Sequence, residues 1–224
     1  MSHSLAGVMF AVAVAVGGCG SSGGVGEADV VAYLKAAPPA DQARVLAAVT
    51  PAPPERTDLI GRAGKPLTIV GTPPEVGAMA PDATLADGTL KPIKLADFRG
   101  KTVVLSVVPS IDTRVCEAQT HAVSNARAQL PASVVLITVS RDLPFAQTRF
   151  QEEAKTETLF GSDYNGGGFG KAWGLAVKES GLLARSVWVI DPSGKITYRE
   201  LVADQTTEPD YAPLIAAAKA AAGG

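Results

Sequence analysis

Short apolar runs rich in β-branched residues alternate with longer amphipathic segments from about residue 57 to the C-terminus. The apolar runs predict strands at 67–70, 102–108, 134–139, 159–160, 186–190 and 195–201. The amphipathic segments predict helices at 116–130, 144–155, 169–173 and 209–222. This order predicts an α/β fold, with a mixed central sheet, helices on both faces, and an N-terminal β-hairpin that turns near 61–65.

The spacing of apolar residues in the segment 116–130 predicts which face of that helix is buried. Residues three to five positions apart fall on one side of a helix, and here they are small or apolar. The expected buried face consists of Val115, Ala118, Ala122, Ala126 and Leu130.

The N-terminus has a different pattern. Leu5–Val16 is an apolar run too short to span a bilayer and suited to a signal peptide, although the MSHS before it lacks Lys and Arg. Val16-Gly17-Gly18-Cys19 then resembles a bacterial lipobox, so we expect a signal peptide at 1–18, lipid attachment at Cys19, and an exported lipoprotein on the periplasmic or cell-envelope side. The alternative is an N-terminal buried helix. Residues 19–56 are predicted to be a flexible linker with weak helix, and 57–224 the folded domain.

Composition narrows the functional classes. Hydrophobic residues make up 46% of the 224 residues and charged residues 19%, which is enough apolar material for an ordinary core. A formal net charge of −2 gives no electrostatic footprint for nucleic acid. Two cysteines and two histidines, with one of each near the N-terminus, rule out a Cys/His metal cluster in the domain. The sequence predicts no cofactor.

The segment Pro109–Cys116 (PSIDTRVC) carries the candidate chemistry, because it joins an apolar strand to a helix. A cysteine in the first turn of a helix meets unpaired N–H groups and the positive end of the helix dipole, which favour the thiolate. We expect Thr113 or Asp112 to cap this helix, and the Thr113 hydroxyl to meet a ligand bound at the sulfur. Pro109 ends the strand and is expected to shield the thiol from water.

Several motifs resemble those of the bacterial thiol peroxidases, the atypical 2-Cys branch of the peroxiredoxins. The matching stretches cover the chain from about residue 57 to its end and are ADFRGK (96–101), PSIDTRVC (109–116), RDLPFAQTRF (141–150), LLARSVWVID (182–191) and TTEPDY (206–211). The resemblance implies a thioredoxin-like fold and reduction of hydrogen peroxide and small organic hydroperoxides. It also implies roles for Cys116 as the peroxidatic nucleophile, Thr113 as a donor to the peroxide, Pro109 as a shield and Arg185 as the arginine that completes the site. A homodimer is implied by the resemblance alone.

Arg185 is also a candidate site residue on physical grounds alone, without the resemblance to the family. An arginine just before a core strand is costly to bury alone, so it needs an anionic partner. A thiolate would be one such partner. The alternatives are Asp112, Glu179 or a position that faces solvent.

The chain departs from the family at the resolving cysteine, whose position aligns with Thr138. Cys19 would be bonded to lipid, so a sulfenic acid on Cys116 would be resolved by an external thiol, either thioredoxin-like or small. The membrane contact would be through the lipid anchor only. The alternative is a redoxin-like sensor or binding domain that does not turn over efficiently. A thioredoxin-type exchanger would need the Cys-x-x-Cys that this chain lacks.

Other features carry less chemistry. The glycine-rich stretch 166–171 fails as a P-loop, because Asn165 and Ala172 stand where Gly and Ser/Thr are needed. His121 has no evident Asp or Asn partner and is expected to be solvated or half-buried. Phe145 could line the mouth of the site or pack in the core, and Trp173 and Trp188 are expected to serve mainly in the core.

Overall fold

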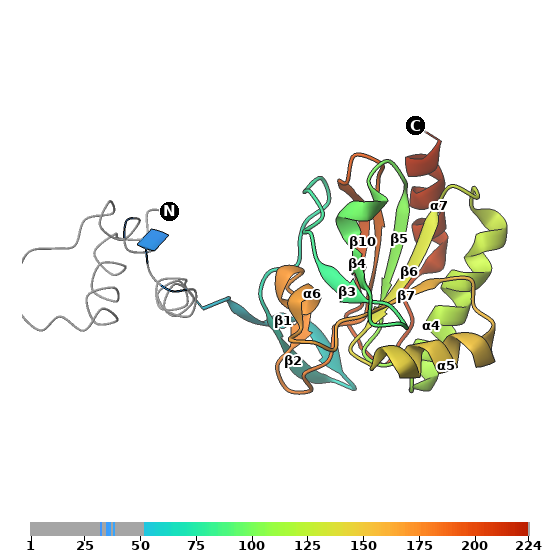
Figure 1. Ribbon diagram of the computed structural model, residues 1–224. Coiled ribbons are helices and arrows are strands. Elements are labelled where there is room, and N and C mark those ends of the chain that lie inside the picture. Colours follow the sequence, from blue (N-terminus) through green and yellow to red (C-terminus); the bar gives the residue numbers. More distant parts are fainter. Residues whose placement is uncertain (1–31, 33–34, 37, 39–51, 224) are drawn as a thin grey trace, which may run out of the picture. The chain divides into compact units, whose positions relative to one another are not determined.

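The computed structural model describes residues 32, 35, 36, 38 and 52–223 (Figure 1). The predicted signal peptide, Cys19 and most of the predicted linker lie outside these residues. Within the described part of the chain, no helix has both the length and the apolar character needed to cross a membrane. One compact unit of the chain begins at Pro53.

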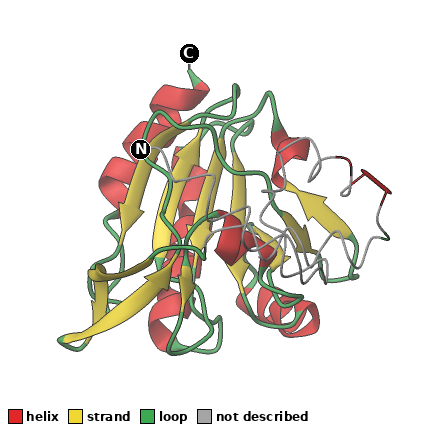
Figure 2. Ribbon diagram, turned by 90° about the vertical axis from the view of Figure 1, so that its left-hand side faces the viewer, coloured by secondary structure: helices red, strands yellow, loops and turns green. Residues whose placement is uncertain are grey.

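A seven-stranded mixed sheet forms the centre of this unit (Figure 2). In spatial order the strands are β10 (Ile196–Leu201), β9 (Ser186–Ile190), β5 (Val103–Val107), β6 (Val135–Ser140), β7 (Leu159–Ser162), β3 (Thr84–Ala86) and β4 (Pro92–Lys94). Strands β5, β6 and β7 are parallel, and the other pairs in the sheet are antiparallel. The predicted α/β fold with a mixed sheet is confirmed, but the short strands β3 and β4 were not predicted.

Helices lie on both faces of the sheet, as predicted (Figure 1). The four α-helices of the unit are α4 (Arg114–Asn125), α5 (Pro144–Ala154), α6 (Gly168–Ala172) and α7 (Tyr211–Ala222). Two 3₁₀ turns accompany them, η1 (Leu95–Phe98) and η2 (Ala126–Gln129). The helix predicted at 116–130 is therefore α4 continued by η2.

The predicted N-terminal hairpin is present as β1 (Glu55–Arg62) and β2 (Lys65–Val70), and β8 (Ala176–Val177) adds a third strand. Ala63 and Gly64 form its two-residue turn with φ of 49° and 77°. Two consecutive residues with positive φ are what a tight hairpin turn requires, and Gly adopts that conformation without strain. The hairpin includes Glu55 and Arg56, which the sequence analysis had placed in the linker.

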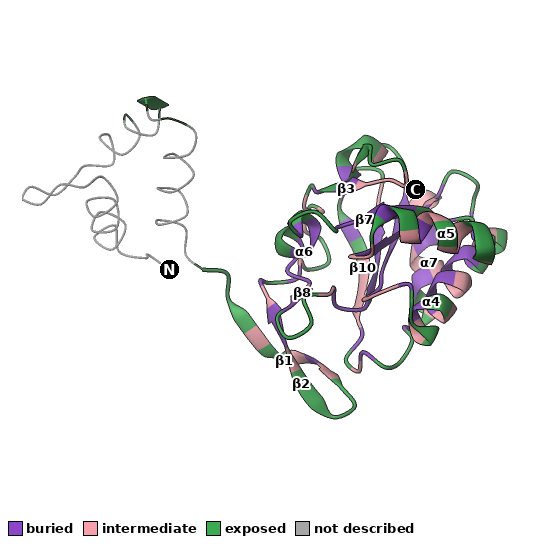
Figure 3. Ribbon diagram, turned by 60° about the horizontal axis from the view of Figure 1, so that its bottom comes forward, coloured by how far each residue is buried: buried purple, intermediate pink, exposed green. Residues whose placement is uncertain are grey.

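The sheet separates two hydrophobic clusters, and alternate residues of β5 contribute to each. Leu105 packs on the side of α6 with Trp173, whereas Val104 packs on the side of α4 and α7 with Leu214. Every residue of β5 is buried, as expected for a central strand covered on both faces. Figure 3 shows that exposed residues gather instead on the outer faces of the helices and at the tip of the β1–β2 hairpin. A third, smaller cluster contains Cys116 and Phe160.

The predicted buried face is confirmed for Ala126 and Leu130, which lie in η2 and directly after it, but it is wrong within α4. Val115, Ala118 and Ala122 are only half-buried. The buried residues are Cys116, Gln119, Thr120, Val123 and Ser124. Most of these are polar, and hydrogen bonds inside the protein offset the loss of water around them: Gln119 Nε2 donates to Ser106 Oγ at 2.9 Å, and Thr120 Oγ1 donates to the Cys116 carbonyl at 2.8 Å.

Candidate active site

Cys116 is a free, fully buried cysteine in the first turn of α4. The first helical hydrogen bond runs from the Glu117 N–H to the Thr113 carbonyl at 2.9 Å, so the N–H groups of residues 114–116 precede the helical ladder. Thr113 occupies the N-cap position, but its side chain makes no capping hydrogen bond and its hydroxyl lies 3.5 Å from the Ser110 carbonyl. The predicted side-chain cap is therefore wrong, and the hydrogen bond given for the Thr113 hydroxyl in the described structure is this long one to the Ser110 carbonyl.

Arg185 lies against the Cys116 sulfur. Its Nη2 donates to Cys116 Sγ at 3.2 Å, although the two residues are 69 positions apart in sequence. Its Nη1 donates to Gln119 Oε1 at 2.8 Å and its Nε to the Gln205 carbonyl at 3.2 Å. The side chain is almost completely buried, and these three acceptors hold the guanidinium in one orientation.

The charge of Arg185 has no carboxylate partner among the described residues. Glu179, one of the alternatives, instead accepts hydrogen bonds from the Thr68 N–H and hydroxyl, and Asp112 is exposed. A buried guanidinium needs a negative group nearby to offset its desolvation. The group in contact with the guanidinium that can carry such a charge is the Cys116 sulfur.

Gln119 is a part of the site that sequence reasoning missed. It accepts from Arg185 and donates to Ser106 on β5, so it fixes the guanidinium to the central sheet. Its position three residues after Cys116 places both side chains on the same face of α4. That spacing was the available signal, and the apolar periodicity of the helix obscured it.

Asp142 holds the loop that leads into α4, and it was also missed. Its carboxylate accepts from the Ser110 hydroxyl at 2.7 Å and from the Ile111 N–H at 2.8 Å. The motif at 141–150 indicated that this segment matters, but it did not indicate the role of Asp142. The contact ties the loop before Cys116 to the end of β6.

A pocket of about 220 Å³ opens beside these groups. Pro109, Thr113 and Arg185, all singled out from the sequence, line it together. Cys116 lies behind this wall with no exposed surface. The structure thus brings the four candidate residues to one place, with a polar donor and a cation facing a cavity that can admit a small molecule.

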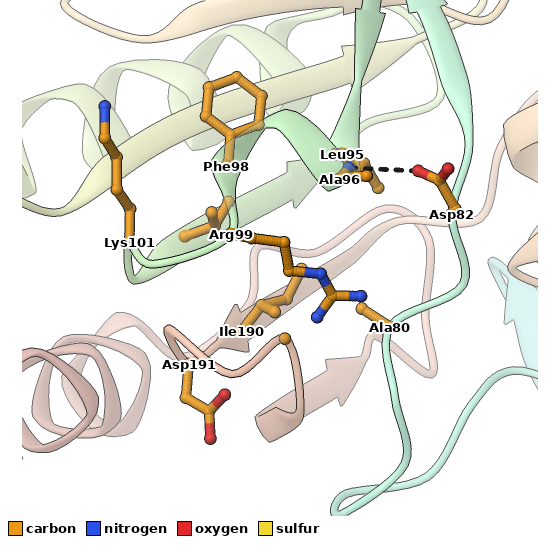
Figure 4. A pocket seen from close by; sticks show the side chains of 11 residues that line it. Ala80, Asp82, Leu95, Ala96, Phe98, Arg99, Lys101, Ile190 and Asp191 are labelled. Atoms are coloured by element: carbon orange, nitrogen blue, oxygen red, sulfur yellow. Dashed lines mark hydrogen bonds between the residues drawn. The ribbon is translucent and has the colours of Figure 1, made fainter.

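A second cavity, of about 20 Å³, lies beside η1 and is shown in Figure 4. Its lining side chains serve the fold: the Ala96 N–H donates to Asp82 at 3.2 Å, and Arg99 donates to the Ser193 carbonyl at 2.8 Å. A volume of this size suits about one water molecule. The candidate chemistry therefore belongs to the pocket beside Cys116.

Comparison with known proteins agrees with this geometry. Residues 75–215 match the family model described as Redoxin. The chain is 46% identical over 160 residues to a thiol peroxidase of Bacillus subtilis, which covers 70% of this chain and 94% of that protein. It is 44% identical over 157 residues to a thiol peroxidase of Streptococcus parasanguinis, with 70% and 95% covered.

The chain belongs to the thiol peroxidase family. Its activity is that of a thiol peroxidase, a peroxiredoxin enzyme. Among solved structures, a peroxiredoxin-like protein from Aquifex aeolicus is similar with a TM-score of 0.68 and 32% identity, over 74% of this chain and 98% of that one. A thiol peroxidase from Chromobacterium violaceum shares the fold with a TM-score of 0.64 and 18% identity, over 70% and 92%.

Thr138 is an unsuitable place for the resolving cysteine of a thiol peroxidase. It lies in β6, which pairs with β5 on one side and β7 on the other, and its hydroxyl is 3.1 Å from that of Thr158. A cysteine there could approach another sulfur only by breaking ladder hydrogen bonds on both sides. The alignment of this position with the resolving cysteine is therefore not supported. Whichever position aligns with the resolving cysteine, the sequence contains two cysteines, Cys19 and Cys116.

The remaining candidates lie away from the sulfur. His121 is half-exposed and 4.0 Å from Glu117, consistent with a solvated histidine. Phe145 is exposed and does not line the pocket, so neither role considered for it is observed. Trp173 and Trp188 are fully buried in an edge-to-face pair, in agreement with a core role.

Proposed function

We propose that Cys116 is the peroxidatic residue and that it reduces hydrogen peroxide and small organic hydroperoxides. The Cys116 thiolate attacks the terminal oxygen of the O–O bond, an S–O bond forms, and the O–O bond breaks. Sulfur loses two electrons and becomes a sulfenic acid. The leaving oxygen takes the electron pair and a proton, and departs as water or an alcohol.

Three further residues are assigned roles in this step. Arg185 stabilises the thiolate and the charge that develops on the breaking O–O bond, supported by its 3.2 Å contact with the sulfur. Thr113 donates a hydrogen bond to the peroxide from the wall of the pocket. Pro109, half-buried at the end of β5, keeps water from the thiolate and its reactive product.

An external thiol completes the cycle. Its thiolate attacks the sulfenic sulfur, a mixed disulfide forms, and hydroxide leaves as water after protonation. A second thiol then releases Cys116 and carries away the disulfide. Cys116 is the one cysteine within the described residues, and Cys19 is expected to carry lipid, which supports resolution from outside the chain. The reductant is thioredoxin-like or a small thiol.

One observation carries the proposal: a buried arginine without a carboxylate partner in the described structure donates to the thiol of the family's nucleophilic motif. The test is peroxide consumption with dithiothreitol by the wild type and by Cys116→Ser. We expect turnover by the wild type and none above background by the variant. Equal rates would refute the proposal. If Cys116 is oxidised once but does not turn over, the alternative of a redoxin-like sensor or binding domain holds instead.

We also propose that the protein is exported and anchored by lipid at Cys19, and that it forms a homodimer. The apolar run and the lipobox-like sequence support the anchor, and the resemblance to the family supports the dimer. The anchor is tested by membrane fractionation and fatty-acid labelling of the wild type and Cys19→Ser, with loss of label expected in the variant. Light scattering of the detergent-solubilised protein tests the dimer, and a monomeric mass would contradict it.

A further inference from the structure

The pocket beside Cys116 is larger than hydrogen peroxide requires. Its volume of about 220 Å³ is several times the roughly 30 Å³ that one water molecule occupies in the liquid. A peroxide bound between Thr113 and Arg185 would fill only a small part of this volume. The rest of the space is available to the organic part of a hydroperoxide.

The lining combines apolar residues and arginines with four neutral polar residues, which are Thr113, Ser180, Gln205 and Thr206. The apolar residues that line the pocket besides Pro109 are Leu67, Val115, Val177, Leu182 and Leu183. The charged residues of the lining are Arg62, Arg114 and Arg185, so every charge that faces the pocket in the described structure is positive. Arg185 is already engaged with Cys116, and this leaves two arginines without a role in the proposed step.

Arg62 and Arg114 are exposed, and neither side chain forms a hydrogen bond or ion pair with another described residue. Arg62 comes directly before the two-residue turn of the β1–β2 hairpin, and Arg114 is the first residue of α4. The two therefore reach the same pocket from different elements. The acidic residues closest to Arg114 in sequence, Asp112 and Glu117, do not line the pocket.

Local stability does not explain either arginine. Arg62 pairs across the hairpin with Lys65, and like charges directly opposite each other are destabilising. Arg114 lies at the positive end of the α4 dipole, where a cation is unfavourable. The positions of Arg62 and Arg114 are thus each unfavourable for the stability of the fold, and both add positive charge to the same pocket. This charge indicates an anionic ligand.

We propose that Arg62 and Arg114 bind the carboxylate of an organic hydroperoxide whose apolar chain lies along the wall of the pocket. The inference rests on the proposed function of Cys116, and the chemistry is unchanged: the hydroperoxide is reduced to the corresponding alcohol. The two arginines are specificity-determining residues, because they select hydroperoxides that carry both an apolar chain and a negative charge.

The experiment compares an alkyl hydroperoxide that ends in a carboxylate with its methyl ester, using full-length protein. Dithiothreitol is the reductant for both substrates, and its reaction with the sulfenic acid does not enter kcat/KM for the hydroperoxide, because that constant describes only the peroxide step. The readout is the ratio of kcat/KM for the acid to that for the ester, in which any general change in sulfur reactivity cancels. The variants are Arg62→Gln/Arg114→Gln and, as a matched control, Lys219→Gln, an exposed cation on α7 outside the pocket.

We expect the wild type to prefer the acid about tenfold, the factor that corresponds to about 1.4 kcal/mol. The double variant should show a ratio near one, and the Lys219 variant should keep the wild-type ratio. Added salt should lower the wild-type preference, because both arginines are exposed. A wild-type ratio near one, or a double variant that keeps the preference, would overturn the inference while the proposed function stands. Failure to reduce these compounds and hydrogen peroxide would instead overturn the proposed function, and this inference with it.

Discussion

Replacement of Arg185 by glutamine should slow the oxidation of Cys116 by roughly 100- to 1,000-fold, the range found when one preorganised donor to developing charge is removed. The structure allows a second approach to the magnitude. At an effective dielectric constant of about 20, unit charges separated by the 3.2 Å between Arg185 Nη2 and Cys116 Sγ attract by roughly 5 kcal/mol. Part of that is offset because the buried guanidinium loses water. A net loss of about 3 kcal/mol in the stabilisation of the transition state corresponds to a decrease in rate within the same range.

The assay is a single-turnover measurement of Cys116 oxidation by hydrogen peroxide, so the reductant does not enter the rate. Arg199→Gln is the matched control, because Arg199 is another partly buried arginine that donates to a backbone carbonyl, that of Pro74, but lies outside the pocket. Far-ultraviolet circular dichroism should show both variants folded. A folded Arg185→Gln protein that is oxidised at the wild-type rate would refute the role given to the arginine.

Three further predictions follow from the site. Thr113→Val should lower the single-turnover rate about tenfold or more. It should leave the melting temperature nearly unchanged, because the Thr113 hydroxyl makes no capping bond. A large drop in melting temperature with an unchanged rate would contradict this prediction. Asp142→Ala removes two hydrogen bonds to the loop 110–111 and should reduce the free energy of unfolding by about 2 kcal/mol, with faster alkylation of Cys116 by iodoacetamide; unchanged alkylation would oppose the loop-anchor role. Excess peroxide without thiol should convert Cys116 to sulfinic acid, as mass spectrometry would detect, and full recovery of activity by dithiothreitol would argue against it.

The long apolar strands could be predicted because their burial leaves a direct mark in the sequence. Every residue of β9 is buried, and the strand spans the predicted 186–190. The short strands β3, β4 and β8 have two or three residues each, which is too few for a period to show. They are held by partners distant in sequence, and local propensity says little about such pairing.

The helix that carries Cys116 shows where hydrophobic patterning fails. Its buried face includes Gln119 and Thr120, because their hydrogen bonds form inside the protein and serve the site. Hydrophobic patterning assumes that polar residues are exposed, so it predicts that this face of the helix points toward solvent. Departures of this kind are expected at functional sites, where local rules yield to chemistry.

The contact between Cys116 and Arg185 was expected from the cost of burying an arginine and from the resemblance to the family. The orientation of the guanidinium was beyond the sequence, because it depends on Gln119 in α4 and on the Gln205 carbonyl after β10. The pocket could not be predicted from the sequence either. Its lining comes from the hairpin, α4 and the segments around β8 and β9, which only the folded chain brings together.

The role of Cys116 as the peroxidatic residue is tested most directly by chemical trapping of the oxidised sulfur. The reduced full-length protein would be treated with one equivalent of hydrogen peroxide and dimedone, without a thiol, and its peptides analysed by mass spectrometry. We expect one sulfenic acid adduct per chain, on Cys116, and no internal disulfide. Peroxide consumed without an adduct on Cys116, or a disulfide between Cys116 and Cys19, would contradict it.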